Sequence, residues 1–356
     1  MRILFLVPYP IQEAPSQRFR FEQYLSTLKE AGYDCTIQSF LTKKAWLKFY
    51  KAGNFVPKAL GLFLGYMRRA QMLLTLHKFD FVFVHRELSP AGPPLLSWLI
   101  SKVWKKKIIY DFDDAIWLTN YSENNKLFAR LKSYENSKTL MKRSWKNSCG
   151  NHWLVDQAKA FNPSSFYIPT TIDTVKAHNR VREINLKSPV IGWTGSHSTI
   201  SYLESILPQL RELVAKHPFE LVVISNLAPE FTFPSMRFIK WNAATEIDDL
   251  LQIDIGLMPL PESRWAEGKC GLKALQYMAL GIVPAVSPIG VNSSIVTHQV
   301  NGIHVLDGQW EKALSDLLCS PEKTLEMGRK TRDLIIEDYS VLANEAKFLH
   351  LFAQIH

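Results

Sequence analysis

Apolar residues in this chain fall into short continuous runs, separated by longer segments in which apolar positions recur every three or four residues. The runs at 2–7, 79–85 and 189–195 are typical of strands buried on both faces of a parallel sheet. The periodic segments between the runs predict amphipathic helices. Further strands are expected at 35–40, 107–114, 151–154, 166–169, 219–225, 236–241, 253–260 and 283–286. Helices are expected at 20–31, 42–77 with a break near 53–57, 95–104, 123–146 and 199–217, and again at the C-terminus.

Strands that alternate with helices in two successive series predict two doubly wound α/β domains. The polar segment 174–188 has no periodicity and reads as the linker between them. We therefore expect a first domain over 1–185, a second over 186–340, and a final helix over 341–356 that packs back toward the first domain. Doubly wound sheets bind ligands at the carboxyl ends of their strands, so the site is expected in a cleft between the domains.

Residues 264–292 carry the most specific chemical signal. The first half of this segment combines glycines with charged and polar side chains, namely Glu267, Gly268, Lys269, Gly271, Lys273 and Gln276. A loop rich in Gly and Lys that leads into a helix N-terminus brings together free N–H groups, the positive end of a helix dipole and lysine charges. The segment therefore predicts a phosphate or diphosphate site. The alternative is a helix that only packs between two strands.

The same segment resembles the donor-site region of retaining GT-B glycosyltransferases of family four, the "group 1" class. The residues on matching positions are Gly271, Leu272, Leu275, Met278, Ala279, Gly281 and Ser287. The resemblance implies the GT-B fold, in which two Rossmann-like domains face each other across a cleft. It also implies transfer of a sugar from a nucleotide-diphosphate sugar with retention of configuration, without a bound metal and without any cofactor beyond that co-substrate.

The chain departs from the family pattern at two positions. Gln276 occupies the place of the glutamate that would grip the ribose hydroxyls. Gly268 occupies the place of the glutamate that would contact the sugar, and Glu267 lies one residue earlier. A glutamine can accept one hydrogen bond and donate another, but it lacks the charged bidentate grip of a carboxylate. The residues expected to act in catalysis are Lys269, Lys273, Glu267 and Asp113.

A second phosphate-binding turn is expected at 192–198, between the first strand and first helix of the second half. Gly195 allows a tight turn, and Ser196 and Ser198 could bind a phosphate, although a plain helix cap explains the same residues. His197 of the same turn is also expected to bind the donor. His197 is the only basic residue between positions 192 and 209. Lys269 and Lys273 would therefore supply the positive charge that balances a bound phosphate. The alternative is that both are solvated lysines on an exposed face. If one helix includes both lysines, they share a face of it.

The remaining candidates lie at other strand ends. Asn226 and Trp241 come at the ends of the next two strands and are expected to bind the donor. In the first half, Arg18, Arg20, His85 and Asp114 are expected on the acceptor side. Surface arginines and a structural histidine are the alternatives. Strand alternation would place Asp111 and Asp113 on one side and Asp114 on the other, so a metal site there is possible but not favoured.

Composition and charge narrow the setting. The chain has 356 residues, 47% hydrophobic and 21% charged, as expected for an ordinary globular enzyme. Its four cysteines are widely spaced, which argues against a zinc site and for a reducing compartment. The opening segment lacks a signal-peptide cleavage site, and no apolar run approaches the ~20 residues that span a bilayer. Residues 1–185 contain 28 Lys and Arg against 14 Asp and Glu, a net charge of +14, whereas the remainder carries −5.

Basic and aromatic residues alternate between Lys43 and Arg69. This mixture suits an anionic membrane surface, although single-stranded nucleic acid or core-facing aromatics under a solvated basic face would give the same pattern. No recognised nucleic-acid module accompanies it, so nucleic acid is not expected as a partner. We expect a cytoplasmic enzyme at the inner face of the cell membrane that transfers sugar to a glycan or lipid-linked acceptor in surface polysaccharide synthesis. The alternatives are a sugar-nucleotide epimerase on the same fold and a non-catalytic sugar-nucleotide binding protein.

Overall fold

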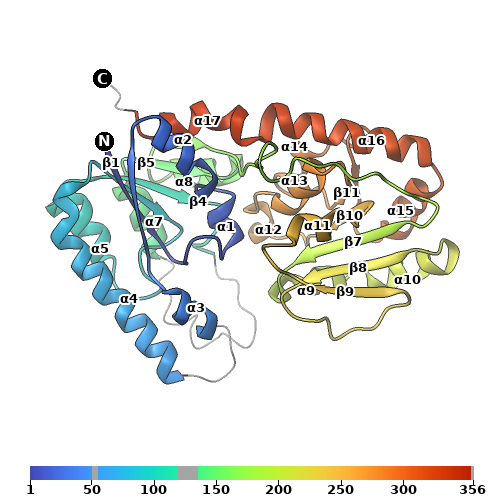
Figure 1. The fold of residues 1–356 in the computed structure, drawn as a ribbon, viewed down its shortest axis with the longest axis horizontal. Coiled ribbons are helices and arrows are strands. Elements are labelled where there is room, and N and C mark those ends of the chain that lie inside the picture. Colours follow the sequence, from blue (N-terminus) through green and yellow to red (C-terminus); the bar gives the residue numbers. More distant parts are fainter. Residues whose placement is uncertain (50–54, 119–134, 354–356) are drawn as a thin grey trace. The chain divides into compact units, whose positions relative to one another are not determined.

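The computed structural model describes residues 1–49, 55–118 and 135–353, and the chain divides into two compact units (Figure 1). The first unit comprises Met1–Pro169 and Glu345–His356, and the second comprises Thr170–Asn344. The chain thus passes into the second unit before the boundary expected near residue 185. Residues 170–185 belong to the second unit, and the C-terminal segment returns to the first.

The first unit is built on a parallel sheet with the strand order β2-β1-β3-β4-β5-β6, six strands within the described residues. These strands are β1 (Arg2–Val7), β2 (Asp34–Ser39), β3 (Phe81–His85), β4 (Lys107–Phe112), β5 (Lys146–Cys149) and β6 (Ser165–Tyr167). The order reverses between β1 and β3, which defines a doubly wound sheet. The central strands are almost wholly buried, as their continuous apolar sequences predict.

Helices connect these strands. They are α1 (Pro15–Arg18), η1 (Glu22–Tyr24), α2 (Leu25–Glu30), α3 (Lys43–Phe49), α4 (Phe55–Thr75), η2 (Leu76–Lys78), α5 (Leu95–Trp98), η3 (Leu99–Val103), α7 (Glu135–Arg143) and α8 (His152–Lys159). The expected helix at 20–31 is broken into short segments. Of the expected helix at 123–146, residues 123–134 lie outside the described part of the chain, as do Tyr50 and Lys51.

Aromatic packing joins the first unit to its C-terminal segment. The rings of Phe5 and Phe83, from neighbouring strands, lie 4.9 Å apart between centroids. Tyr24 stacks on Phe348 at 4.2 Å with an interplanar angle of 8°. Phe348 belongs to α17 (Val341–His350), so the last helix completes the core of the first unit.

The second unit has the strand order β12-β11-β10-β7-β8-β9, again with parallel pairing. Its strands are β7 (Val190–Gly195), β8 (Glu220–Ser225), β9 (Met236–Lys240), β10 (Ile255–Met258), β11 (Val283–Val286) and β12 (Ile303–His304). Read from β9, this is the third, second, first, fourth, fifth and sixth strand of the unit, which is the order of a Rossmann sheet. The order reverses between β7 and β10.

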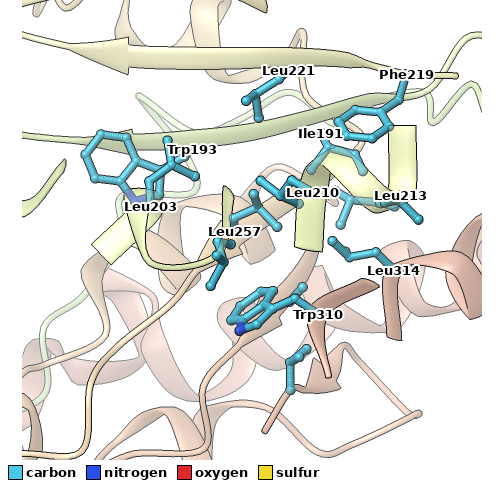
Figure 2. Packing of buried hydrophobic residues seen from close by; sticks show 14 of the residues in the cluster. Ile191, Trp193, Leu203, Leu210, Leu213, Phe219, Leu221, Leu257, Trp310 and Leu314 are labelled. Atoms are coloured by element: carbon cyan, nitrogen blue, oxygen red, sulfur yellow. The ribbon is translucent and has the colours of Figure 1, made fainter. Parts of the chain in front are cut away.

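The helices of the second unit cover this sheet. They are η5 (His197–Thr199), α9 (Ile200–Glu204), α10 (Leu207–Lys216), α11 (Glu246–Leu250), α12 (Arg264–Glu267), α13 (Leu272–Ala279), α14 (Asn292–Ile295), α15 (Trp310–Leu318), α16 (Pro321–Leu334) and η6 (Ile335–Tyr339). Figure 2 shows how Trp193 and Ile191 of β7 meet leucines of α9 and α10, with Trp310 of α15 nearby in the same core. The apolar spacing of these helices places their leucines on the side facing the sheet.

One expected strand is wrong. Residues 151–154 were expected to be extended, but the strand in this region is β5, and α8 begins at His152. Asn151 caps this helix, because its side-chain oxygen accepts a hydrogen bond from the Leu154 N–H at 2.7 Å. Asparagine before an apolar run is a helix-start signal as well as a turn signal, and the capping interaction decides between them here.

Candidate functional site

Two separate polar clusters lie around the strand ends of the first unit. In the first, Arg20 donates hydrogen bonds to both Asp111 oxygens, at 2.5 and 3.3 Å. His85 Nδ1 lies 2.8 Å from the same carboxylate. Burial alone would raise the pKa of Asp111, but Arg20 and His85 hold it well below its usual value.

This cluster bears on two expected acceptor residues. The side chains of Arg20 and His85 are both fully buried. Their charged or polar groups contact Asp111 rather than solvent. In this structure they therefore belong to a buried polar network inside the first unit. Arg18, the third residue expected there, is partly exposed and lies 5.1 Å over the ring of Phe19.

The second cluster gathers around Arg86. Its Nη1 donates to Asp113 at 2.8 Å and to Asp114 at 3.0 Å. Burial would lower the pKa of Arg86, but the two carboxylates raise it above its usual value. The expectation that Asp113 and Asp114 face opposite sides is wrong, because β4 ends at Phe112 and the strand alternation stops before them.

Arg86 also forms part of the wall of a pocket in the first unit. The other lining residues include Leu88, Pro93, Tyr110, Asn136 and Leu140. The Tyr110 hydroxyl donates to the Arg86 carbonyl at 2.8 Å, which fixes the backbone of this segment. Asp113 and Asp114 are bonded to Arg86, which is one of the residues of this wall.

In the second unit, the reversal of strand order between β7 and β10 marks the crevice where such sheets bind ligands. The loop after β7 begins at Gly195, and the chain after β10 leads through α12 to α13. The two segments that were expected to bind phosphate therefore leave the sheet from adjacent strands. If the two segments form one phosphate site, residues of one segment must lie in contact with residues of the other.

Gly195 and Lys273 do meet. A methyl group added at Gly195 would lie 2.5 Å from the Trp193 ring and 2.7 Å from Lys273 Nζ. The Lys273 ammonium also lies 4.3 Å from the centroid of the Trp193 ring, in a cation–π contact. The absence of a side chain at position 195 leaves the space that this lysine occupies.

Lys273 is partly buried, and its electrostatic setting is unusual. Desolvation, with a smaller contribution from the charge of Lys269, lowers the pKa of Lys273 to about 7. The two lysines are therefore near neighbours. They do not share a helix face, however, because Lys269 lies between α12 and α13.

The start of α13 depends on Gly271. This residue is the N-cap and has φ of +69°, a conformation that disfavours any side chain. A Cβ there would also lie 2.6 Å from Ile295 Cδ1. Gly271 thus turns the chain so that Lys273 falls in the first turn of the helix, at the positive end of its dipole.

Gln276 lies further along α13 and is 4% exposed. Its Nε2 has no hydrogen-bond partner within residues 1–49, 55–118 and 135–353. Buried amides are nearly always paired, so an unpaired one on this helix is a specific feature. The position is the one that the resemblance assigns to the ribose.

The loop after β7 is held by Asn226. Gly195 pairs with Ser225 in the register of β7 and β8, and the next residue, Asn226, accepts a hydrogen bond from the His197 N–H at 2.7 Å. Ser196 and Ser198 lie 2.8 Å apart between their hydroxyl oxygens. Asn226 therefore shapes the loop, and Ser196 and His197 remain partly or fully exposed.

The other residues expected at the donor site are Trp241, Glu267 and Gly268. The Trp241 indole N–H donates to Glu246 at 3.1 Å. Glu267 ends α12, and Gly268 follows it as the C-cap. The Glu267 backbone would lie 2.8 Å from a Cβ at Gly290, so the loop 287–291 packs closely on this turn.

The described residues contain no group of three or more His, Cys, Asp or Glu that could hold a metal ion. No helix in the described ranges is long and apolar enough to cross a bilayer.

No protein-family model and no curated protein sequence matches the chain. Solved structures do. Sucrose-phosphate synthase from Thermosynechococcus elongatus is similar with a TM-score of 0.68 and 11% identity, over 99% of this chain and 98% of the other. HepE from Anabaena, in complex with UDP and glucose, matches with a TM-score of 0.67 and 12% identity over 100% of both chains. A glycosyltransferase from Rickettsia africae matches with a TM-score of 0.68 and 14% identity, over 99% of this chain and 97% of the other.

The chain has the GT-B fold. Both units contain a doubly wound parallel sheet, as the sequence predicted. At these identities the likeness establishes the fold and leaves the chemistry to the site itself.

Several residues that shape the two candidate sites were not singled out from the sequence. Trp193 supports Lys273, Tyr277 accepts a hydrogen bond from the Thr194 N–H at 3.0 Å, and Arg86 holds two aspartates. Trp193 could have been noticed in the sequence, because it is an aromatic residue only two positions before Gly195. Arg86 and the aspartates are 27 and 28 residues apart, and only the parallel pairing of β3 with β4 brings them together.

Proposed function

We propose that this protein is a glycosyltransferase that moves a sugar from a nucleotide-diphosphate sugar to a glycan or lipid-linked acceptor. The observation that carries the proposal is the meeting of Lys273 with Gly195 where the strand order of the second unit reverses. This is the position at which a Rossmann-like sheet binds a nucleotide. The bound UDP of the similar HepE structure supports the same class of ligand.

The donor would be held by its diphosphate. Lys273 in the first turn of α13 and the nearby Lys269 provide two positive charges, and the helix dipole adds to them. On the loop after β7, Ser196 is exposed and His197 is partly exposed. Gln276 would reach the ribose through its unpaired amide.

The reaction breaks the bond between the sugar and the diphosphate, so negative charge develops on the departing nucleoside diphosphate. Lys269, Lys273 and backbone N–H groups near Gly195 would offset that charge without a metal. Glu267 would contact the sugar from the turn before α13. Retention of the anomeric configuration is part of the proposal by resemblance.

The acceptor would bind to the first unit. Asp113 and Asp114 offer carboxylate oxygens beside the pocket at Arg86, where they could orient acceptor hydroxyls. A lipid-linked acceptor would bring the enzyme to the inner face of the cell membrane, where we place the reaction, in surface polysaccharide synthesis. The four cysteines are free in the structure and fit that reducing side.

A second candidate function has one observation in its favour. Gly268 and Gln276 replace the two glutamates of the family pattern, which would suit a protein that binds a sugar nucleotide without transferring it. A sugar-nucleotide epimerase is the remaining alternative on this fold.

The proposal is tested by incubating the protein with UDP-, GDP-, ADP- and TDP-sugars, with and without a membrane lipid and glycan extract. We expect one donor to release nucleoside diphosphate in step with the appearance of a glycosylated product, and release to depend on the extract. Binding without release would support the binding protein. Conversion of the sugar nucleotide without an acceptor would support the epimerase, and either result would overturn the proposal.

A further inference from the structure

Helix α4 of the first unit, seen in Figure 1, runs from Phe55 to Thr75. It exposes an apolar stripe between Val56 and Leu74. Val56, Leu60, Phe63, Met67 and Leu74 are 79%, 55%, 59%, 43% and 73% exposed. With the exposed Ala70 between the last two, these positions are spaced alternately by four and three residues. That spacing puts them on one side of a helix. A contiguous apolar stripe of this length on a water-facing surface marks an interaction site.

The opposite side of α4 is anchored in the unit. Arg69 is fully buried and donates hydrogen bonds to the carbonyls of Leu88, Gln38 and Val7 at 2.8 to 3.0 Å. Gly65 is packed so closely that a Cβ would lie 2.5 Å from the Phe40 ring. Because these contacts fix which side of the helix faces inward, the stripe is held outward. It cannot turn into the core of the unit.

Within the sequence segment that carries the stripe, the charged residues have a single sign. No Asp or Glu occurs between Asp34 and Asp80, whereas the same segment contains eight basic residues. Lys43, Lys44 and Lys48 are exposed on α3, which packs against α4 where a Cβ at Gly61 would lie 3.1 Å from Ala45 Cβ. The apolar stripe therefore lies beside a predominantly cationic surface; the carboxylate of Glu13, from outside the segment, pairs with Lys43 at 3.0 Å.

We infer that the α3–α4 surface, defined by the exposed side chains of residues 43–48 and 56–75, docks the protein on an anionic lipid bilayer. The stripe would enter the boundary between headgroups and acyl chains, while the lysines contact the headgroups. Helix α4 is not apolar enough to cross a bilayer, so it would lie in the plane of the interface. This inference goes beyond the proposed sugar transfer and holds whether or not the protein turns over a donor.

A second copy of the chain is the other occupant that an apolar helix face could have. A symmetric dimer through α4 would bring two copies of the same cationic segment together, with no acidic residue in either segment to pair with it. Like charges at such a contact are unfavourable, whereas an anionic bilayer is complementary to them. The charge pattern therefore favours the bilayer.

The test is flotation of the full-length protein with vesicles of phosphatidylcholine alone or mixed with phosphatidylglycerol, at low and at physiological salt. The wild-type protein should float with the anionic vesicles and stay unbound with the neutral ones. Leu60→Gln/Phe63→Gln/Met67→Gln should weaken the binding about tenfold or more, because three apolar side chains leave the interface. Lys43→Gln/Lys44→Gln/Lys48→Gln should remove the preference for anionic lipid.

A matched triple variant provides the control. Leu325→Gln/Ile336→Gln/Leu342→Gln changes three exposed apolar residues on helical segments of the second unit, 38%, 45% and 69% exposed, and should bind vesicles as the wild type does. Unfolding temperature confirms that each variant folds. Equal binding by the stripe variant and the wild type would overturn the inference. So would a dimer, detected by sedimentation without lipid, that the stripe variant dissociates. Neither readout uses a nucleotide sugar, so failure here would leave the proposed function standing.

Discussion

At the scale of single residues, Lys273 is the side chain on which the donor site most depends. It lies against an aromatic ring and beside a glycine, and the charge of Lys269 is close by. Two neighbouring cations at the positive end of a helix dipole are unfavourable by themselves. An anion bound between them and the loop at Gly195 would reverse the sign of that interaction.

The pKa of Lys273 makes this testable through pH. In the ligand-free protein Lys273 is protonated below about pH 7 and neutral above it. A bound diphosphate favours the protonated form, so binding above pH 7 takes up a proton. Affinity for a nucleotide sugar, whose diphosphate is a diester with no ionisation near neutrality, should fall by up to about tenfold per pH unit from about pH 7 to about pH 9.

Calorimetry in buffers with different ionisation enthalpies measures both the affinity and the proton uptake. Lys273→Met is the matched control, since it keeps the length of the side chain and removes the titrating group. Its affinity should be lower and independent of pH over this range. A wild-type affinity that stays constant from pH 7 to pH 9 would remove Lys273 from the donor contact.

Gln276 offers a second prediction at this scale. Gln276→Leu is close to isosteric and removes the buried amide that has no partner, so it should not lower the unfolding temperature. If the amide binds the ribose, the same variant should lose about tenfold in donor affinity. Gln276→Glu should be tolerated and should bind the donor at least as tightly, since a carboxylate is the stronger acceptor. Unchanged binding by Gln276→Leu would make this residue a packing position only.

At the scale of elements, the loop-to-helix junction at Gly271 determines where Lys273 is presented. Gly271→Ala would place a Cβ in a left-handed conformation and against Ile295. Gly308, with φ of +76° and no atom within 4 Å of the point where a Cβ would lie, gives the control. Gly308→Ala should cost about 1 kcal/mol in unfolding free energy, as a left-handed position alone does. Gly271→Ala should cost more and should also weaken donor binding, which Gly308→Ala should not. Equal effects of the two variants on donor affinity would contradict the role given to this junction.

The buried carboxylate of Asp111 joins elements of the first unit. It contacts Arg20 between α1 and η1, His85 at the end of β3, and Ser148 of β5. Asp111→Asn would remove the carboxylate that pairs with the buried guanidinium of Arg20, and breaking a buried ion pair costs about 3–5 kcal/mol. Asp113→Asn is the control, because Arg86 keeps its bond to Asp114. Urea unfolding should show a large loss of unfolding free energy for the first variant and a clearly smaller loss for the second. Similar losses in the two variants would show that the pairing of Asp111 with Arg20 does not stabilise the first unit more than the pairing of Asp113 with Arg86 does.

The elements also show what a sequence can and cannot reveal. The strands β1, β3 and β8 were predicted within a residue or two, because a strand buried on both faces requires a nearly continuous run of apolar residues. The segment at 151–154 was misread, because a cap at Asn151 and a turn before a strand have the same composition. Contacts between residues far apart in sequence, such as Arg20 with Asp111, depend on sheet register and could not be predicted.

At the scale of the whole molecule, the fold could be predicted from the sequence, whereas the candidate site could be predicted only in part. The alternation of strands and helices, and the residues from Gly271 to Ser287, were enough to predict two Rossmann-like units of the GT-B type. The partnership of Gly195 with Lys273 needed the reversal of strand order between β7 and β10, which no local pattern carries. Arg69, counted within an exposed basic run, is instead buried, because helical position alone did not show which side of α4 faces the sheet.

The central claim is that the second unit binds a nucleotide-diphosphate sugar between the loop at Gly195 and the start of α13. Calorimetric titration of the wild type and Lys269→Ala, with the donor picked from the UDP-, GDP-, ADP- and TDP-sugars by thermal shift, tests it most directly. Lys312→Ala, an exposed lysine of the same unit, is the control. A ligand that binds only the folded state raises the unfolding temperature, so at least one nucleotide sugar should do so. The account predicts that Lys269→Ala then binds that donor about tenfold more weakly while unfolding at the same temperature as the wild type. No thermal shift with any of the four donors, or equal affinity for wild type and Lys269→Ala, would contradict it.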